Sequence, residues 1–481
     1  MRRLWLLLPL VLLALLLPGT EPPPPAPPAG RAPFAWNRDA EWRRLEERFQ
    51  HHRADCTTAA EHLAPAQAEL QALLTTLEQA PLPADAPELE RTEALLFDVA
   101  TAYAACPGAD ASPELEWLAR FRDAVKVQSS RWPLEQAEAR ARLYRLLYGA
   151  RAALEEALLQ QPLREVPPLA RGRAVKSETP AIHVQGVELH SGDLLVSRGG
   201  AATSALIARG SDFPGNFSHV ALLHVDAATR AATVVEAHIE VGLKAVPLAT
   251  YLADKKLRIL ALRLREGVTA DGQLPHRAAT TALERARRGH VAYDFAMDAA
   301  EHSKLFCSEV AWAAYEAQGV KLWPGLSRIS APGTRRWLWS VGVRHFETLE
   351  PSDLEYDPQL AVVAEWFDGE ALAKDHRDNA VTDVLLEEAE RGAELPVTWW
   401  KLPVARLAKA WSAVLVANGR AGPVPEGMSA EAALRSTAYT ARHEALRAGL
   451  DARAAAFTRE KGYPPPYWQL VELARPPVIA R

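Results

Sequence analysis

The hydrophobic pattern of the chain changes at about residue 182, and this change limits the possible folds more than any other feature. Before it, apolar residues recur three and four positions apart, as in amphipathic helices. After it come short β-rich runs, which predict strands at 193–197, 219–225, 232–238 and 257–264. Helical stretches alternate with these strands, at 204–208, 276–288 and 308–318. We therefore expect the middle of the chain to be of the α+β class.

The same pattern divides the 481 residues into separate regions. Residues 34–165 are dense in Ala, Leu, Glu and Arg and predict a bundle of about four helices. A linker rich in proline and charge, 162–180, separates this bundle from the α+β domain, which we place at 180–349. Helical composition returns in residues 350–481, with helices expected at 381–391, 405–418 and 429–461. Neither flanking region carries a recognisable chemical motif.

Residues 1–33 have the order of a secretory signal peptide followed by a proline-rich linker. Arg2 and Arg3 precede the apolar run 4–18, and a stretch rich in Pro, Ala and Gly follows it. The alternative is an uncleaved membrane anchor, but this run is shorter than the ~20 apolar residues that span a bilayer and contains Pro9. We therefore predict export to the periplasm or the cell exterior, with membrane contact only through an uncleaved leader.

The charge balance argues against a nucleic-acid partner. Lys and Arg number 55 against 60 Asp and Glu, which gives a net charge of −5 at pH 7. A chain of this balance has no overall positive field to hold a phosphate backbone. The histidines outside the candidate site described below lack the HExxH or paired CxxC spacing of zinc proteins, so neither a metal site nor a cofactor is predicted.

The chain has three cysteines, an odd number for an exported protein. Cys56 and Cys106 both lie in the helical N-terminal region and are predicted to form a disulfide, which leaves Cys307 as the free thiol. The alternative is that all three are buried free thiols, because cysteine is among the residues most often buried.

Cys307 lies in the segment LFCSEVAWAAYEAQG, residues 305–319, at or just before the start of a predicted helix. The positive end of a helix dipole can lower a thiol pKa to roughly 3.5–7.5, at which the thiolate can attack an acyl carbonyl. Cys307 is therefore a candidate nucleophile. The alternative is a small apolar residue that fills the start of the helix.

His219 is the best candidate for the base, because it begins the strand predicted at 219–225, whereas His224 points to the opposite face. If the hairpin loop is 226–229, paired residues sum to 225 + 230 = 455, and Glu236 lies opposite His219. A register that sums to 457 places His238 there instead, on the same face. We prefer Glu236, because a carboxylate can fix the imidazole tautomer.

Several segments together resemble a known family. GDLLVSR (192–198), FSHVALL (217–223), VVEAH (234–238), YDFAMD (293–298) and LFCSEVAWAAY (305–315) are similar to the YiiX/YaeF-like branch of the NlpC-type papain-like cysteine hydrolases. In this branch the papain order is circularly permuted, so that histidine comes first, its polar partner next and cysteine last. The likeness covers about residues 187–343. The flanking helical regions resemble no family that we can name.

The resemblance implies an antiparallel sheet against which a helix bearing Cys307 is packed. Cys307 would attack a carbonyl, His219 would accept and return the proton, and Glu236 would orient the ring. Tyr293 and His238 are possible supporting residues, Tyr293 for the oxyanion together with the backbone N–H of Cys307. Tyr293 and the neighbouring Asp294 could equally form a structural turn.

We expect an exported, thiol-dependent hydrolase that cleaves amide or ester bonds in a cell-envelope substrate, either a peptidoglycan peptide or a lipid. Two alternatives remain open. One is a lipid acyltransferase on the same fold, and the other is a non-catalytic envelope-binding or scaffold protein in which the helical flanks do the binding.

Overall fold

The computed structural model describes residues 19, 23–27, 32–34, 40–106, 112–323, 325–418 and 420–476. Most of the predicted leader, residues 1–33, lies outside the described residues. Within them, no helix combines the length and the apolar character that crossing a bilayer requires.

A seven-stranded sheet, in which every neighbouring pair is antiparallel, forms the centre of the molecule. Its order is β1-β11-β8-β4-β5-β6-β7. The bounds are β1 Leu169–Arg171, β4 Leu194–Gly199, β5 His219–Val225, β6 Ala232–His238, β7 Gly242–Pro247, β8 Lys256–Leu264 and β11 Leu360–Phe367. Strands β4 to β7 follow one another in sequence and in space, so that β5 and β6 form the hairpin that carries His219 and Glu236.

Two hydrophobic layers enclose the sheet. Alternate residues of β4, β5, β6 and β8 pack on one face against α9 (Leu274–Arg288) and α10 (Cys307–Glu316). The remaining residues of these strands pack on the other face against α8 (Leu248–Ala253) and the hairpin of β2 (Ala181–Val184) and β3 (Val187–His190). Successive residues of a strand point to opposite faces of the sheet, and both faces are covered here. The strands are therefore apolar on both faces.

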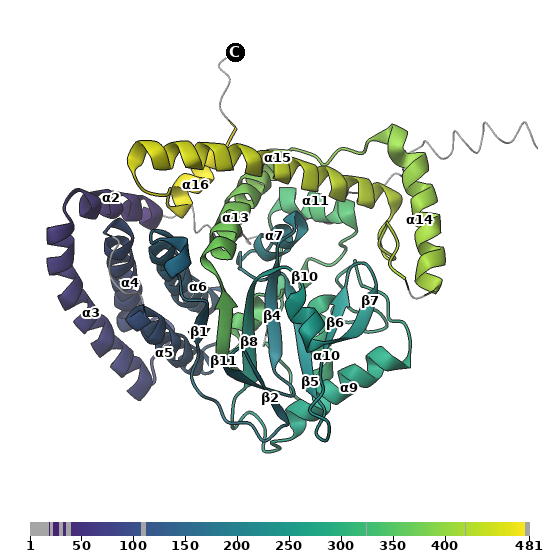
Figure 1. Ribbon diagram of the computed structural model, residues 1–481, viewed down its shortest axis with the longest axis horizontal. Coiled ribbons are helices and arrows are strands. Elements are labelled where there is room, and N and C mark those ends of the chain that lie inside the picture. Colours follow the sequence, from purple (N-terminus) through teal and green to yellow (C-terminus); the bar gives the residue numbers. More distant parts are fainter. Residues whose placement is uncertain are drawn as a thin grey trace, which may run out of the picture.

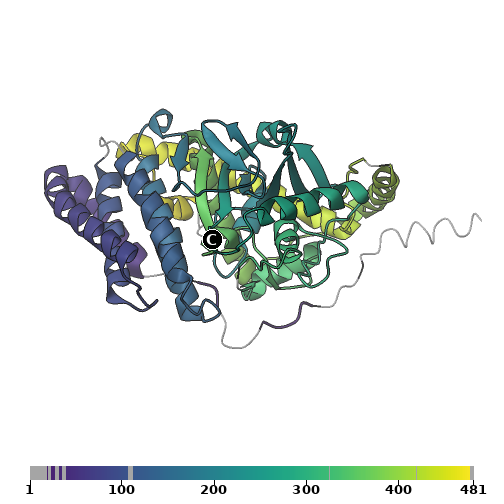
Figure 2. The same ribbon diagram turned by 90° about the horizontal axis from the view of Figure 1, so that it is seen from below.

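Helices lie on two further sides of the sheet (Figures 1 and 2). The N-terminal bundle lies beside the β1–β11 edge and consists of α2 (Ala40–Ala54), α3 (Cys56–Gln79), α4 (Pro87–Ala105), α5 (Ser112–Ser129) and α6 (Ala137–Leu159). A second helical layer packs around one core, from α7 (Ala202–Arg209), α11 (Pro332–Val341), α13 (Gly369–Glu390), α15 (Ala430–Lys461) and α16 (Tyr467–Ala474). Helix α14 (Leu402–Ala417) lies beside α15, at the end of the molecule opposite the bundle (Figure 1).

Five short elements complete the described chain. They are the 3-10 turns η2 (Leu163–Glu165) and η3 (Trp399–Lys401), helix α12 (Asp353–Tyr356) and the strand pair of β9 (Ser327–Arg328) with β10 (Glu347–Thr348).

The α+β class predicted from the sequence is confirmed, and so are its main elements. The four predicted strands correspond to β4, β5, β6 and β8, and the predicted helices of the middle domain to α7, α9 and α10. The agreement arises because apolar residues recur every second position in the strands and about every 3.6 positions in the helices, which makes the two kinds of element easy to tell apart.

The predicted boundaries of the sheet-bearing domain differ from the structure at both ends. Strand β11 lies in the region expected to be helical, 350–481, yet it pairs with β8 from Leu360↔Leu264 to Phe367↔Arg258. Strand β1 lies in the predicted linker and pairs with β11. The sequence LAVVAEWF of β11 is rich in β-branched and aromatic residues, and this composition could have indicated the strand. The sheet therefore extends past residue 349, and the flanking regions share its edge.

Buried ion pairs join the bundle, the sheet and the C-terminal helices. Arg258 on β8 pairs with Glu155 on α6, and its Nη2 lies 2.8 Å from Oδ2 of Asp375 on α13. Arg151 on α6 pairs with Glu365 on β11. All five side chains are buried, so each charge depends on its partners for stabilisation.

Removing one member of this network should strongly destabilise the protein. We expect Arg258→Met to lower the free energy of unfolding by about 3–5 kcal/mol, because Glu155 and Asp375 would stay buried with one cationic partner fewer. Arg288→Met removes an exposed pair with Glu284 and should cost less than about 1 kcal/mol. Urea unfolding compares the two variants, and equal losses would contradict a structural role for the network.

A disulfide joins Cys56, the first residue of α3, to Cys106, the residue after α4, and Cys307 is a buried free thiol. This is the arrangement that the odd cysteine count predicts. The bond connects two neighbouring helices of the bundle across 50 residues of sequence.

The same pairing predicts the number of free thiols in the purified protein. Titration under denaturing but non-reducing conditions should find one reactive thiol per chain, and three after reduction. Three thiols before reduction would show that the disulfide does not form.

Candidate active site

Cys307 lies at the N-terminus of α10, where the local sequence favours the start of a helix. The carboxylate of Glu309, three residues on from Phe306, accepts a hydrogen bond of 3.0 Å from the backbone N–H of Phe306. The apolar residues of α10 pack on β5 and β6 and fix this end of the helix against the sheet. The thiol therefore sits where unpaired N–H groups and the positive end of the helix dipole meet.

The Sγ of Cys307 lies against the backbone of β5, next to His219. It is 3.9 Å from the carbonyl oxygen of Ser218 and is in hydrogen-bonding contact with the N–H of Val220. Among the described residues, no hydrogen bond joins Sγ directly to the His219 ring, so the thiol or the ring must turn before a proton passes between them.

The carboxylate of Glu236 lies between two imidazole rings. Its Oε2 is 2.8 Å from Nε2 of His219, and its Oε1 is 3.0 Å from Nε2 of His238. The amine of Lys244 on β7 lies 3.7 Å from the same Oε1. Because Glu236 occupies Nε2 of His219, it leaves Nδ1 as the nitrogen that can exchange a proton with a thiol.

The preferred hairpin register was wrong, although the choice of Glu236 does not depend on it. Residues of β5 and β6 pair as Ala221↔Glu236 and Val225↔Ala232, which sums to 457 rather than 455. The loop is longer than expected, because Asp226 accepts hydrogen bonds from Ala228 and Thr229 and its own N–H bonds to Ala231. His238 therefore lies beside His219, and Glu236 reaches His219 diagonally.

Burial and hydrogen bonding set the charges of this group. Burial opposes ionisation of Glu236, yet its bonds to His219 and His238 outweigh it and hold the carboxyl pKa well below its usual range. Burial lowers the pKa of His219 below 6.5. Burial also acts to lower the pKa of His238, but the neighbouring carboxylates of Glu236 and Glu240 outweigh it and raise this pKa. At neutral pH, Glu236 is therefore an anion and His219 a neutral imidazole.

The thiol pKa differs from the expectation for a helix N-terminus. Burial raises the pKa of Cys307 to about 11, although the N–H of Val220 acts to lower it. Glu350 also acts to raise this pKa, and burial lifts its own carboxyl pKa to about 8. Desolvation thus outweighs the helix dipole, and Cys307 is a neutral thiol in the resting structure.

Tyr293 also belongs to this group. Its hydroxyl is in hydrogen-bonding contact with both the side chain and the backbone N–H of Cys307, and burial raises its pKa far above the usual value. The phenol therefore stays protonated beside the sulfur. Asp294 instead accepts hydrogen bonds from the N–H groups of Ala296 and Asp298 and stabilises a turn.

Sequence reasoning missed Glu350. This buried residue follows β10 and lies outside the predicted 180–349 domain, and a single glutamate before a proline carries no motif that could have pointed to it. The loop after it reaches the site through Ser352, whose hydroxyl contacts the backbone of Phe217.

His219, Glu236 and His238 could also hold a metal ion, because one ligand atom from each lies within 4.8 Å of the others. Two imidazoles and a carboxylate are ligands that suit zinc. The same atoms already bond to one another as a carboxylate between two rings, which accounts for their closeness without an ion.

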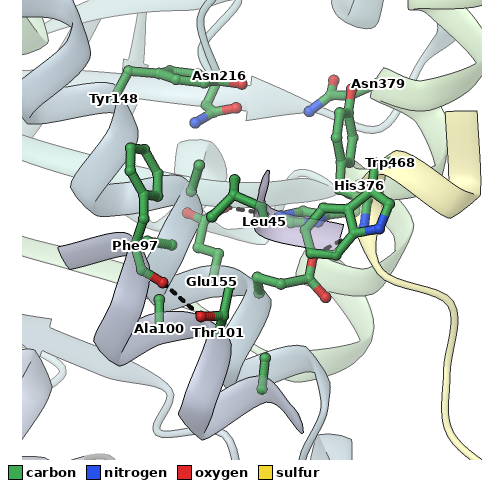
Figure 3. A pocket seen from close by; sticks show the side chains of 15 residues that line it. Leu45, Phe97, Ala100, Thr101, Tyr148, Glu155, Asn216, His376, Asn379 and Trp468 are labelled. Atoms are coloured by element: carbon green, nitrogen blue, oxygen red, sulfur yellow. Dashed lines mark hydrogen bonds and ion pairs between the residues drawn. The ribbon is translucent and has the colours of Figure 1, made fainter. Parts of the chain in front are cut away.

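A separate cavity lies between the N-terminal bundle and α13 (Figure 3). Its apolar side includes Leu45, Phe97 and Trp468, while Asn216 and Asn379 line its polar side. Asn216 is three residues before His219, but none of Cys307, His219 and Glu236 lines this space. The cavity is therefore distinct from the thiol site.

Residues 188–364 match a family model described as the permuted papain-like amidase enzyme, YaeF/YiiX, C92 family. The match ends within β11, in agreement with the extent of the sheet rather than with the predicted boundary at 349. No curated protein and no solved structure matches the chain. The sheet-bearing part of the chain is therefore similar to the permuted papain-like amidases of this family.

The neutral thiol predicts a particular pH dependence of alkylation. Labelling of Cys307 by iodoacetamide should be slow at neutral pH and should keep rising beyond 9.0, the value of an unperturbed thiol, because burial raises the pKa to about 11. His219→Ala should hardly change this profile, since the neutral ring does not generate the thiolate. Labelling that is already maximal at neutral pH, and lost in His219→Ala, would instead indicate a preformed thiolate–imidazolium pair.

Proposed function

We propose that the protein is an exported hydrolase that cleaves amide or ester bonds of a cell-envelope substrate through Cys307, His219 and Glu236. The observation that carries the proposal is the meeting of these three residues at one end of β5. The sulfur lies against the backbone on either side of His219, and Glu236 holds the ring by a 2.8 Å hydrogen bond.

In the first step, Nδ1 of His219 would take the proton of the thiol while Sγ attacks the substrate carbonyl carbon. A C–S bond forms, and the carbonyl π electrons move onto the oxygen. The ionised Glu236 stabilises the imidazolium that results, because it accepts a hydrogen bond from the Nε2–H group and keeps its negative charge. Because the Cys307 thiol and the His219 imidazole are both neutral before the reaction, the proton is transferred during the attack rather than before it.

In the second step, the tetrahedral intermediate would collapse, and the imidazolium would return its proton to the leaving amine or alcohol. Water, deprotonated by His219, then attacks the thioester, and the C–S bond breaks to release the acid and restore the thiol. The backbone N–H of Cys307 and the hydroxyl of Tyr293, which contacts the sulfur, would stabilise the oxyanion.

The leader and the disulfide support an envelope location. A positively charged start followed by an apolar run is typical of export, and disulfides persist in oxidising compartments. The cell envelope contains peptidoglycan peptides, which carry amide bonds, and lipids, which carry ester bonds. Transfer of the acyl group to an acceptor other than water is the alternative outcome of the same thioester, and it would make the protein an acyltransferase.

Substitution of the site residues tests the proposal. With an activated acyl ester as substrate, Cys307→Ala and His219→Ala should each lower kcat by about 10³-fold or more, and the double variant should be hardly slower, because the residues act as a unit. Glu236→Ala should have a milder effect, since His238 packs beside His219 and helps to hold the ring.

His224→Ala is the matched control, because His224 lies on the same strand but faces the opposite side of the sheet, where it stacks on His276. It should keep full activity. A chelator should also leave the wild-type rate unchanged. Loss of activity with the chelator, together with activity in Cys307→Ala, would replace the thiol mechanism with a metal-dependent one at His219, Glu236 and His238.

A further inference from the structure

Helix α14 and the turn before it present large apolar side chains to solvent. Six of them are between 51 and 69% exposed, namely Trp399, Trp400, Val404, Leu407, Trp411 and Val414. Elsewhere in the described chain, the exposed large apolar residues are only Val127 and Leu326, at 40 and 38%. Apolar exposure is thus concentrated on one helix.

These side chains form one continuous stripe, because they follow one another at steps of four and three residues, from Trp400 through Val404, Leu407 and Trp411 to Val414. The other exposed positions on α14 are alanines, at 410, 413 and 417. No charged side chain interrupts the outward face of the helix after Lys401.

The opposite face of α14 is fixed to the body of the protein. Ser412 is fully buried and accepts a hydrogen bond from the N–H of Val424, while Arg406 pairs with Glu431 at the start of α15. The amine of Lys409 donates to the carbonyl of Pro425. The apolar stripe is therefore held outward, at the end of the molecule opposite the N-terminal bundle (Figure 1).

The sequence that contains the stripe carries basic residues and no acidic ones between Glu394 and Glu426, although Arg406 pairs with Glu431 of α15. Residues 395–425 contain Lys401, Arg406, Lys409 and Arg420 and no acidic residue, although the whole chain has a net charge of −5. Lys401 and Arg420 are exposed at the two ends of the helix. Tryptophans beside an apolar face with flanking cations are typical of helices that lie in the interface of an anionic bilayer.

The length of α14 argues for lying on a bilayer rather than crossing it. Its 16 residues extend about 24 Å, less than the ~30 Å of a hydrocarbon core. A second copy of the chain is a poorer occupant, because the 16 residues of α14 hold little more than two heptads, fewer than the roughly three to four heptads over which a coiled-coil pattern is sustained.

The segment after α14 connects this helix to the wall of the thiol site. Val424 and Met428 pack with Phe295, and Nε2 of His290 lies 2.6 Å from Oε2 of Glu426. Gly427 lies so close to Phe295 and the carbonyl of Tyr293 that a Cβ atom would not fit there. Tyr293 in turn contacts Cys307.

We infer that the apolar stripe of α14, formed by Trp399, Trp400, Val404, Leu407, Trp411 and Val414, binds the surface of an anionic lipid bilayer. The stripe enters the boundary between headgroups and acyl chains, and Lys401 and Arg420 meet the lipid phosphates. This surface is independent of the leader, the only part of the sequence that had suggested membrane contact.

Vesicle co-sedimentation of the full chain tests the inference with two double variants. Leu407→Glu/Trp411→Glu places charge in the stripe, and Val127→Glu/Leu326→Glu makes the same change at exposed apolar positions elsewhere. On phosphatidylcholine vesicles that contain phosphatidylglycerol, the α14 variant should partition about tenfold more weakly than wild type or worse. The control variant should bind as wild type does.

Because all these chains keep the apolar leader, a local measurement accompanies the binding. Hydrogen exchange of peptides that cover residues 399–417 should slow when vesicles are added, and peptides of α5, which carries Val127, should not change. Phosphatidylcholine vesicles without phosphatidylglycerol should give weaker protection, and salt should reduce the difference.

Three results would overturn the inference. The first is equal partitioning of both double variants with no protection of residues 399–417. The second is equal protection on neutral and anionic vesicles, which would remove the role of the cations. The third is protection that appears without lipid and grows with protein concentration, which would make a second copy of the chain the occupant of the stripe.

Discussion

The buried ion pairs around Arg258 hold three parts of the chain in one arrangement. Arg258 on β8 contacts Glu155 of the bundle and Asp375 of α13, and these charges lie away from water. A buried charge that loses its partners is costly, so the bundle, the sheet and α13 are expected to separate only when the protein unfolds. The helical flanks are therefore parts of the architecture that supports the thiol site, and not independent modules joined by a linker.

The thiol site shows how burial competes with local electrostatics. A helix N-terminus favours a thiolate, but Cys307 is only 5% exposed and the desolvation of a charge is the larger effect. Burial also keeps His219 neutral, while two imidazole contacts keep Glu236 ionised. In the proposed mechanism, charge would therefore develop only during the reaction: the imidazolium would form next to a carboxylate that is already ionised, and the oxyanion next to N–H and O–H donors.

Sequence alone predicted the elements with strong periodicity and the residues with chemical motifs. Strands β5 and β6 begin and end where expected. Glu236 bonds to the His219 ring, and Cys307 lies against the backbone of Ser218, the residue before His219. The hairpin register was wrong, because the turn chemistry of Asp226 lengthens the loop by two residues, which a pattern of alternation cannot reveal. Strand β11 was missed because a short apolar run between helical stretches fits either structure until its pairing partner is known.

The exposed stripe of α14 shows a second limit of prediction from sequence, which concerns the face that a helix buries. Its sequence has the same spacing of apolar residues as any helix that packs on a core, so the pattern alone indicates an inward face. The structure shows that Ser412 and Leu402 face the protein, whereas Trp400, Leu407 and Trp411 face outward. Which face a helix buries depends on what the rest of the chain leaves uncovered. Because the loop after α14 packs against Phe295 and Tyr293, a bilayer that binds this stripe would lie on the side of the protein from which the wall of the thiol site is built.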